Sequence, residues 1–172
     1  MPTLYTSGEQ VEVYRFPPAV SLGIPLLAIF FQAFVPVRLR FFSIFDLPLL
    51  VTIFFAVARR NPIMGLLTGG IIGLLQDSLS QGAIGVFGIA KTVVGYGASS
   101  LGVKLDVDNP GSRIIMTFLF YILHQLLWLL ITRGMMGETH QLQWGRLMLA
   151  AFANGFLAVP VFSALDKFKQ RV

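Results

Sequence analysis

The chain is built of long apolar runs separated by short polar or turn-rich breaks. Apolar runs of about 17–25 residues are long enough to cross the hydrocarbon core of a bilayer as helices. Such runs predict membrane-spanning helices over residues 18–36, 41–58, 62–79, 84–101, 114–132 and 147–165, after a polar tail at residues 1–16. We therefore expect an all-α, polytopic membrane protein whose residues 1–172 form one bundle of six helices.

The first apolar run is expected to be retained in the protein. No basic segment precedes it and no small-residue cleavage site follows it, so it does not resemble a cleaved signal peptide. The break at Ser80–Gly82 is so short that the helices on either side of it must be antiparallel neighbours.

Composition excludes several classes of protein. The chain is 55% hydrophobic and 12% charged, whereas soluble domains are about 25% charged. This composition argues against an ordinary soluble enzyme, a disordered chain and a coiled coil. The sequence contains no cysteine, which excludes disulfides, thiolate metal sites and a cysteine nucleophile.

The net charge of +5 is interpreted as a topology signal and not as a nucleic-acid-binding signal. Basic residues that flank membrane spans are enriched on the cytoplasmic side. Eight lie on the side of the termini: Arg15, Arg59, Arg60, Lys104, Arg113, Lys167, Lys169 and Arg171. Four lie on the other side: Arg38, Arg40, Arg133 and Arg146. This bias predicts that both termini are cytoplasmic.

The third predicted span carries glycines at every fourth position, Gly65, Gly69 and Gly73. A stripe of small residues lets another helix approach closely. The stripe either packs within this chain, which is the simpler interpretation, or forms a docking face for a helix of another protein.

Charged residues inside predicted spans suggest an ion pair. Asp77 closes the third span and Lys91 lies about a turn and a half into the fourth, so the two could pair. A lysine in lipid is unfavourable unless it pairs or reaches water. A structural ion pair is the simpler interpretation, and a proton relay or anion site is the alternative. Asp46, at the start of the second span, could cap that helix or share Lys91.

Further polar residues lie midway along other spans: Gln32, His124, Gln125 and Asn154. Such groups usually hydrogen-bond across helices inside a bundle. His124 could also titrate or bind a ligand, but a lone histidine is more often structural. We find no catalytic motif, no metal site and no sign of a cofactor.

The longest loop, Arg133–Arg146, contains the apolar residues Met135, Met136 and Trp144. Trp144 could sit at the membrane interface. Alternatively the loop receives a partner protein, because methionines suit adaptable contacts.

The centre of the chain resembles the MreD family of rod shape-determining proteins. The resemblance rests on the glycine-rich helix that ends in Gly73-Leu-Leu-Gln-Asp77, on Ile84-Gly85 after a short turn, and on Gly95-Tyr96. Asp46 before Leu-Pro-Leu is also similar to the family.

The resemblance implies a non-enzymatic, multi-pass protein of the bacterial inner membrane within the cell-elongation machinery. Its implied partners are MreC, RodA with its penicillin-binding transpeptidase, and MreB filaments. The resemblance transfers no catalytic residue to this chain.

An alternative function is that of a small-molecule-binding S subunit of an energy-coupling-factor transporter, a family that shares the motif in outline. It predicts an outward-facing polar pocket that Asp46, Asp77, Lys91 and His124 could line. Such subunits often dock through Ala-x-x-x-Ala on the first helix, and Ala19-x-x-x-Gly23 matches that pattern only imperfectly.

Overall fold

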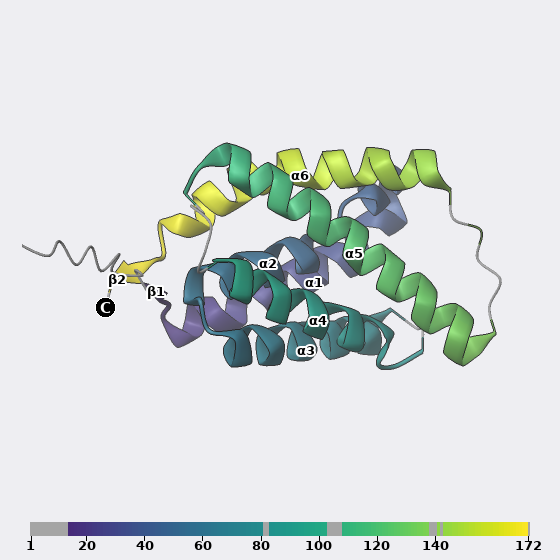
Figure 1. The fold of residues 1–172 in the computed structure, drawn as a ribbon, viewed down its shortest axis with the longest axis horizontal. Helices are drawn as coiled ribbons and strands as arrows, with labels where there is room; N and C mark the ends of the chain where they lie inside the picture. Colours follow the sequence, from purple (N-terminus) through teal and green to yellow (C-terminus); the bar gives the residue numbers. More distant parts are fainter. Residues whose placement is uncertain (1–13, 81–82, 103–107, 138–140, 142, 172) are drawn as a thin grey trace, which may run out of the picture.

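The described part of the computed structural model comprises residues 14–80, 83–102, 108–137, 141 and 143–171. These residues form six α-helices, one 3-10 helix and two short strands (Figure 1). The helices are α1 (Pro18–Arg38), α2 (Leu47–Arg59), α3 (Pro62–Leu79), α4 (Val86–Gly102), α5 (Pro110–Met136) and α6 (Trp144–Asp166). The remaining elements are η1 (Arg40–Ile44), β1 (Tyr14–Arg15) and β2 (Gln170–Arg171). The predicted all-helical architecture is confirmed.

The helices differ in whether they could cross a membrane alone. Within the described residues, α1, α3, α5 and α6 are long and apolar enough to span a bilayer. Helix α2 is apolar but has only 13 residues. At 1.5 Å per residue it rises about 20 Å, which is less than the roughly 30 Å of a hydrocarbon core.

The predicted second span, residues 41–58, is wrong at its start. Residues 40–44 form η1, and α2 begins only at Leu47. Asp46 is the N-cap of α2, and its side chain accepts a hydrogen bond from the Leu49 backbone N–H at 2.9 Å. Pro48 in the first turn fits the same helix start. Hydropathy alone does not separate an apolar 3-10 turn from the helix that follows it.

The loop between the last two helices is shorter than predicted. Helix α5 continues to Met136 and ends at Gly137, whose φ of 67° suits a glycine C-cap. Helix α6 begins at Trp144. The two ends of the predicted loop therefore belong to helices.

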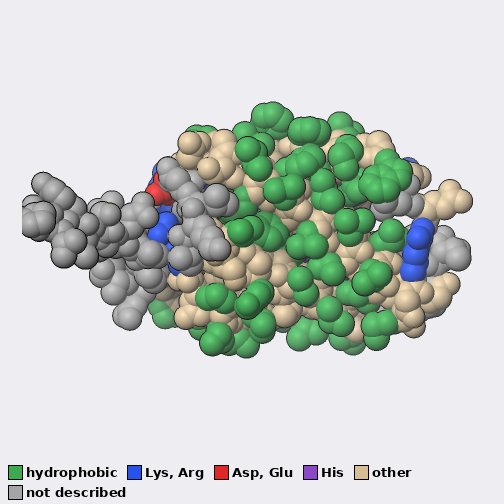
Figure 2. Space-filling view, in the orientation of Figure 1, with side chains coloured by type: hydrophobic (Ala, Val, Ile, Leu, Met, Phe, Trp, Pro, Cys, Tyr) green, Lys and Arg blue, Asp and Glu red, His purple; other side chains and the backbone are tan. Residues whose placement is uncertain are grey.

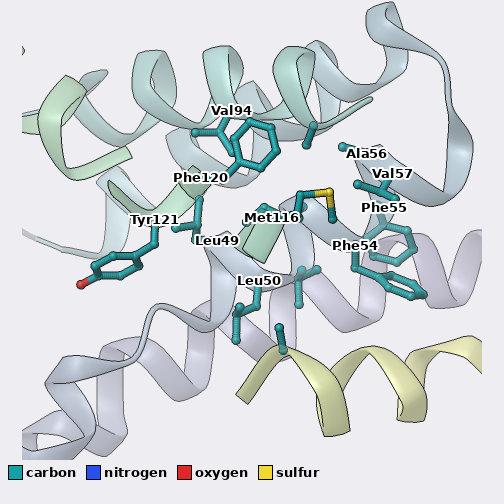
Figure 3. Close-up of a cluster of buried hydrophobic side chains, with 14 of the residues drawn as sticks. Leu49, Leu50, Phe54, Phe55, Ala56, Val57, Val94, Met116, Phe120 and Tyr121 are labelled. Atoms are coloured by element: carbon teal, nitrogen blue, oxygen red, sulfur yellow. The ribbon is translucent and has the colours of Figure 1, made fainter. Parts of the chain in front are cut away.

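Helix α2 forms the centre of the bundle. All its residues from Pro48 to Ala58 are buried, and it contacts each of the other five helices. Figure 3 shows its side chains packed with Val94 of α4 and with Met116 and Phe120 of α5. A helix that is apolar on every face is stable only where neighbours cover it on every side. The longer helices provide that cover.

Helices α3 and α4 pack backbone to backbone. A Cβ atom added at Gly65, Gly69 or Gly73 would overlap a backbone carbonyl oxygen of α4, that of Gly95, Lys91 or Phe87 respectively. The glycine stripe therefore serves a contact within this chain. Helix α4 already covers the face that a helix of another protein would need.

The first and last described segments, β1 and β2, meet at one end of the bundle, which we call the terminal end (Figure 1). Strand β1 pairs antiparallel with β2, with Tyr14 opposite Arg171. The opposite end is the distal end; η1 lies there, α3 and α5 end there, and α4 and α6 begin there (Figure 1). Figure 2 shows hydrophobic side chains over the middle of the molecule and charged side chains near its two ends.

The α3–α4 contact gives a first prediction. Gly69→Ala should destabilise the protein by about 1–3 kcal/mol, because the added methyl group forces the two backbones apart. The measurement is thermal and denaturant unfolding of the detergent-purified protein.

Gly23→Ala is the matched control, because nothing lies within 4 Å of a Cβ atom at that site in α1. Alanine is also the better helix former there. A Gly69→Ala protein that unfolds at or above the wild-type temperature would contradict the packing argument.

Candidate functional site

Polar side chains from every helix converge in the interior, at a level between the middle of the bundle and its distal end. We call this set the six-helix polar cluster. In helix order its members are Gln32, Asp46, Gln76, Lys91, His124 and Asn154. Gln32 lies about 21 Å from the start of α1, and Asn154 about 18 Å from the end of α6, at 1.5 Å per residue. The cluster therefore lies within the apolar thickness of the bundle and away from its charged ends.

Lys91 is at the centre of the cluster and is completely buried, with 0% of its surface exposed. Its Nζ lies 3.0 Å from Asp46 Oδ2 and 3.2 Å from Asp46 Oδ1. It also lies 3.3 Å from His124 Nε2. A buried ammonium group is tolerated only when it is paired and hydrogen-bonded. These contacts use all three of its donors.

This geometry assigns the histidine tautomer. An ammonium group only donates, so His124 Nε2 must accept and the ring proton must lie on Nδ1. The His124 ring also stacks on Phe87, with centroids 5.8 Å apart and planes inclined by 7°. The ring is thus held by a hydrogen bond at one edge and an aromatic contact on its face.

Two amides hold the start of α2. The backbone N–H of Asp46 donates to Asn154 Oδ1 at 2.9 Å, and the N–H of Leu47 donates to Gln32 Oε1 at 3.2 Å. Asn154 Nδ2 donates to the Ile44 carbonyl at 2.9 Å. Backbone donors at a helix start have no partner within the helix. The amides from α1 and α6 therefore allow α2 to begin inside the apolar interior.

The predicted ion pair between Asp77 and Lys91 is wrong, since Lys91 pairs with Asp46. Asp77 instead accepts hydrogen bonds from three backbone N–H groups near the start of α4. Their donors are Gly85, Phe87 and Gly88, at 2.9, 3.1 and 3.0 Å. Asp77 thus fixes the α3–α4 turn. The sequence left two roles open for Asp46, capping of α2 and pairing with Lys91. The structure shows both, because the same carboxylate caps α2 and binds Lys91.

A crevice leads from the cluster to the distal end, and we call it the distal crevice. Its inner part, about 240 Å³, is lined by Gln32, Ser43, Phe45, Asp46, Gln76, Phe87, Tyr121, His124, Gln125 and Trp128. Its outer part, about 400 Å³, shares four of those residues and reaches Gln141, Gln143 and Arg146. Gln76 is a site residue that the sequence does not single out, because its one signal is an amide inside an apolar span next to Asp77.

The apolar residues predicted in the longest loop lie at the distal end. Met135, in the last turn of α5, is 75% exposed, and Trp144, the first residue of α6, is 61% exposed. The side chain of Met136 lies outside the described part of the structure. Among the described residues, no group of three or more His, Cys, Asp or Glu side chains could hold a metal ion.

The ion pair gives a second prediction, tested by a double-mutant cycle. Lys91→Met should destabilise the protein by about 3–5 kcal/mol, because the Asp46 carboxylate is left buried without its counter-charge. Adding Asp46→Asn should recover part of the loss, since the amide oxygen can still cap α2. The expected coupling is about 0.5–3 kcal/mol, measured by unfolding in mixed detergent micelles.

The control cycle pairs Lys91→Met with Asp77→Asn. Asp77→Asn should itself lower stability, because it weakens three bonds to α4. The coupling energy between Asp77→Asn and Lys91→Met should be clearly smaller than that between Asp46→Asn and Lys91→Met. Equal coupling in the two cycles would refute the pairing described here.

The chain was compared with known protein families, curated proteins and solved structures. Residues 15–168 match the family described as rod shape-determining protein MreD. No curated protein and no solved structure matches the chain. The match extends from β1 to beyond the end of α6 and includes every member of the six-helix polar cluster. The chain therefore belongs to the MreD family of rod shape-determining membrane proteins.

Proposed function

We propose that this protein is a non-enzymatic component of the bacterial elongation complex in the inner membrane. There it binds MreC and regulates peptidoglycan synthesis and cell shape. The observation that carries the proposal is the family match over residues 15–168. Further support comes from the polar side chains, which bond to one another inside the bundle, while the surface between the two ends is largely apolar (Figure 2).

In the proposed topology all six helices cross the membrane and both termini are cytoplasmic. Pairing of β1 with β2 at one end of the bundle is consistent with an even number of crossings. The excess of Lys and Arg on that side in the sequence favours a cytoplasmic terminal end. Other helices shield the short α2 from lipid, so it does not have to match the bilayer thickness by itself.

The proposed mechanism is a shift in the population of partner conformations. Binding of this chain would stabilise one arrangement of MreC over another, and MreC would pass the change to RodA and its transpeptidase. MreC is expected to be a bitopic protein with a coiled coil in the periplasm, and in the proposed orientation the distal end faces the periplasm. Met135 and Trp144 are exposed there and are the residues that we propose for this contact.

The binding proposal predicts a stable complex with MreC after co-expression and purification in detergent. Replacing Met135 and Trp144 together by serine should reduce the recovered MreC at least threefold, because the exposed apolar contacts are removed. The measurement is the ratio of the two proteins in the size-exclusion peak.

The matched control replaces Ile63 and Met64 by serine. Both are exposed apolar residues at the terminal end, 71% and 43% exposed, and their replacement should leave the ratio unchanged. An unrelated bitopic membrane protein serves as the negative partner. Equal loss in both double variants would exclude the distal contact, and absence of any complex would exclude MreC binding.

The cellular proposal predicts loss of rod shape. Depletion of this protein in its rod-shaped host should give round cells, and the wild-type chain supplied from a plasmid should restore rods. Normal rods after complete depletion would contradict the proposed role.

A further inference from the structure

Two buried polar atoms at the floor of the distal crevice have no hydrogen-bond partner among the described residues. They are Gln76 Oε1 and His124 Nδ1. Gln76 is 9% exposed and His124 is 1% exposed, and both line the inner part of the crevice. A buried polar group left unpaired costs about 1–3 kcal/mol. Asp46 Oδ2 lies 3.8 Å from His124 Nδ1, which is too far for a hydrogen bond. Two such groups on residues that line one cavity point to a further hydrogen-bonding partner at its floor.

The two atoms specify the chemistry of that group. Because Lys91 donates to His124 Nε2, His124 Nδ1 carries the proton and acts as a donor. Gln76 Oε1 is an acceptor. A hydroxyl group both donates and accepts, so hydroxyls satisfy both atoms. A carboxylate or phosphate would leave Gln76 unpaired and approach the Asp46 carboxylate, whereas an ammonium group would leave His124 unpaired.

The walls of the crevice favour the same chemistry. Most of its polar lining consists of hydroxyl and amide side chains, namely Ser43, Tyr121, Gln125, Gln141 and Gln143. The indole of Trp128 also lines it, and in the outer part so does the guanidinium of Arg146, which donates hydrogen bonds to hydroxyl oxygens as readily as to anions. Hydroxyl and amide groups can each donate and accept hydrogen bonds. An aromatic ring offers an apolar face against which the C–H side of a sugar ring can lie. The outer part, about 400 Å³, falls within the roughly 300–1,000 Å³ typical of small-molecule pockets.

We propose that the distal crevice binds a neutral polyhydroxylated group of the sugar class. The ligand is either the headgroup of a glycolipid in the adjacent leaflet or a free saccharide. Hydroxyls of the ligand bond to Gln76 Oε1 and His124 Nδ1 at the floor, and its ring lies against Trp128. This proposal is argued from the crevice residues and does not require that the protein binds MreC.

Tryptophan fluorescence tests the proposal directly. The chain has two tryptophans, so Trp144→Phe leaves Trp128, on the crevice wall, as the reporter. The protein is placed in phosphatidylcholine nanodiscs that contain increasing fractions of glucosyl-diacylglycerol. The expected result is a saturable change in Trp128 emission, which phosphatidylserine at the same fractions does not produce. Free glucose, titrated into pure phosphatidylcholine nanodiscs, distinguishes a soluble saccharide from a lipid headgroup.

A conservative variant separates ligand binding from a structural role. Gln76→Met keeps the approximate length of the side chain and removes the unpaired amide. Without ligand its melting temperature should equal or exceed that of the parent, because no internal bond of the Oε1 atom is lost. Its affinity for the glycolipid or saccharide should fall at least tenfold. Gln170→Met, at the terminal end, should leave binding unchanged.

Three results would overturn the proposal. The first is no emission change with either the glycolipid or glucose. The second is an equal change with phosphatidylserine, which would show a general effect of lipid composition. The third is a Gln76→Met protein that melts at a lower temperature and binds with the parent affinity, which would make Gln76 a structural residue.

Discussion

The contact between Lys91 and Asp46 is the interaction on which the rest of the structure depends. A fully buried ammonium group requires a carboxylate beside it, and the required carboxylate stands at the N-cap of α2. Helix α2 must therefore begin inside the apolar interior, where its free backbone donors need partners. Gln32 and Asn154 supply them from α1 and α6. One charge pair thus explains why α2 is short, why η1 precedes it, and why amides occur midway along two apolar helices.

Local signals in the sequence were enough to predict much of the fold. The long apolar runs identified α1, α3, α5 and α6, because length and hydropathy alone decide whether a helix can cross a bilayer. Hydropathy misplaces the start of α2 because four of the five residues 41–45 are apolar whether they form a 3-10 turn or a helix. Asp46, followed by Leu47 and Pro48, is a recognisable helix start, and that capping pattern was the better guide.

The members of the site were easier to predict than their partners. Asp46, Lys91, His124 and Asn154 each stood out as polar residues in apolar surroundings. The sequence paired Lys91 with Asp77, because a tight turn guarantees that α3 and α4 are neighbours. Asp77 is instead satisfied by the backbone of that same turn. The true partner comes from a helix 45 positions earlier in the chain. From the sequence, Asp46 is only one residue that could share Lys91, and the three-dimensional placement of α2 identifies it as the ion-pair partner.

The bundle combines a closely packed side with a more open one. Helices α3 and α4 touch backbone to backbone along the glycine stripe, whereas α5 and α6 diverge toward the distal end (Figure 1). His124 ties α5 to the polar cluster, and beyond it α5 continues about 18 Å to Met136 at 1.5 Å per residue. This distal segment carries both Trp128, on the crevice wall, and Met135, on the exposed rim. A ligand in the crevice and a partner on the rim would therefore contact the same stretch of helix. If each favours one position of that segment, each must change the affinity for the other by the same factor.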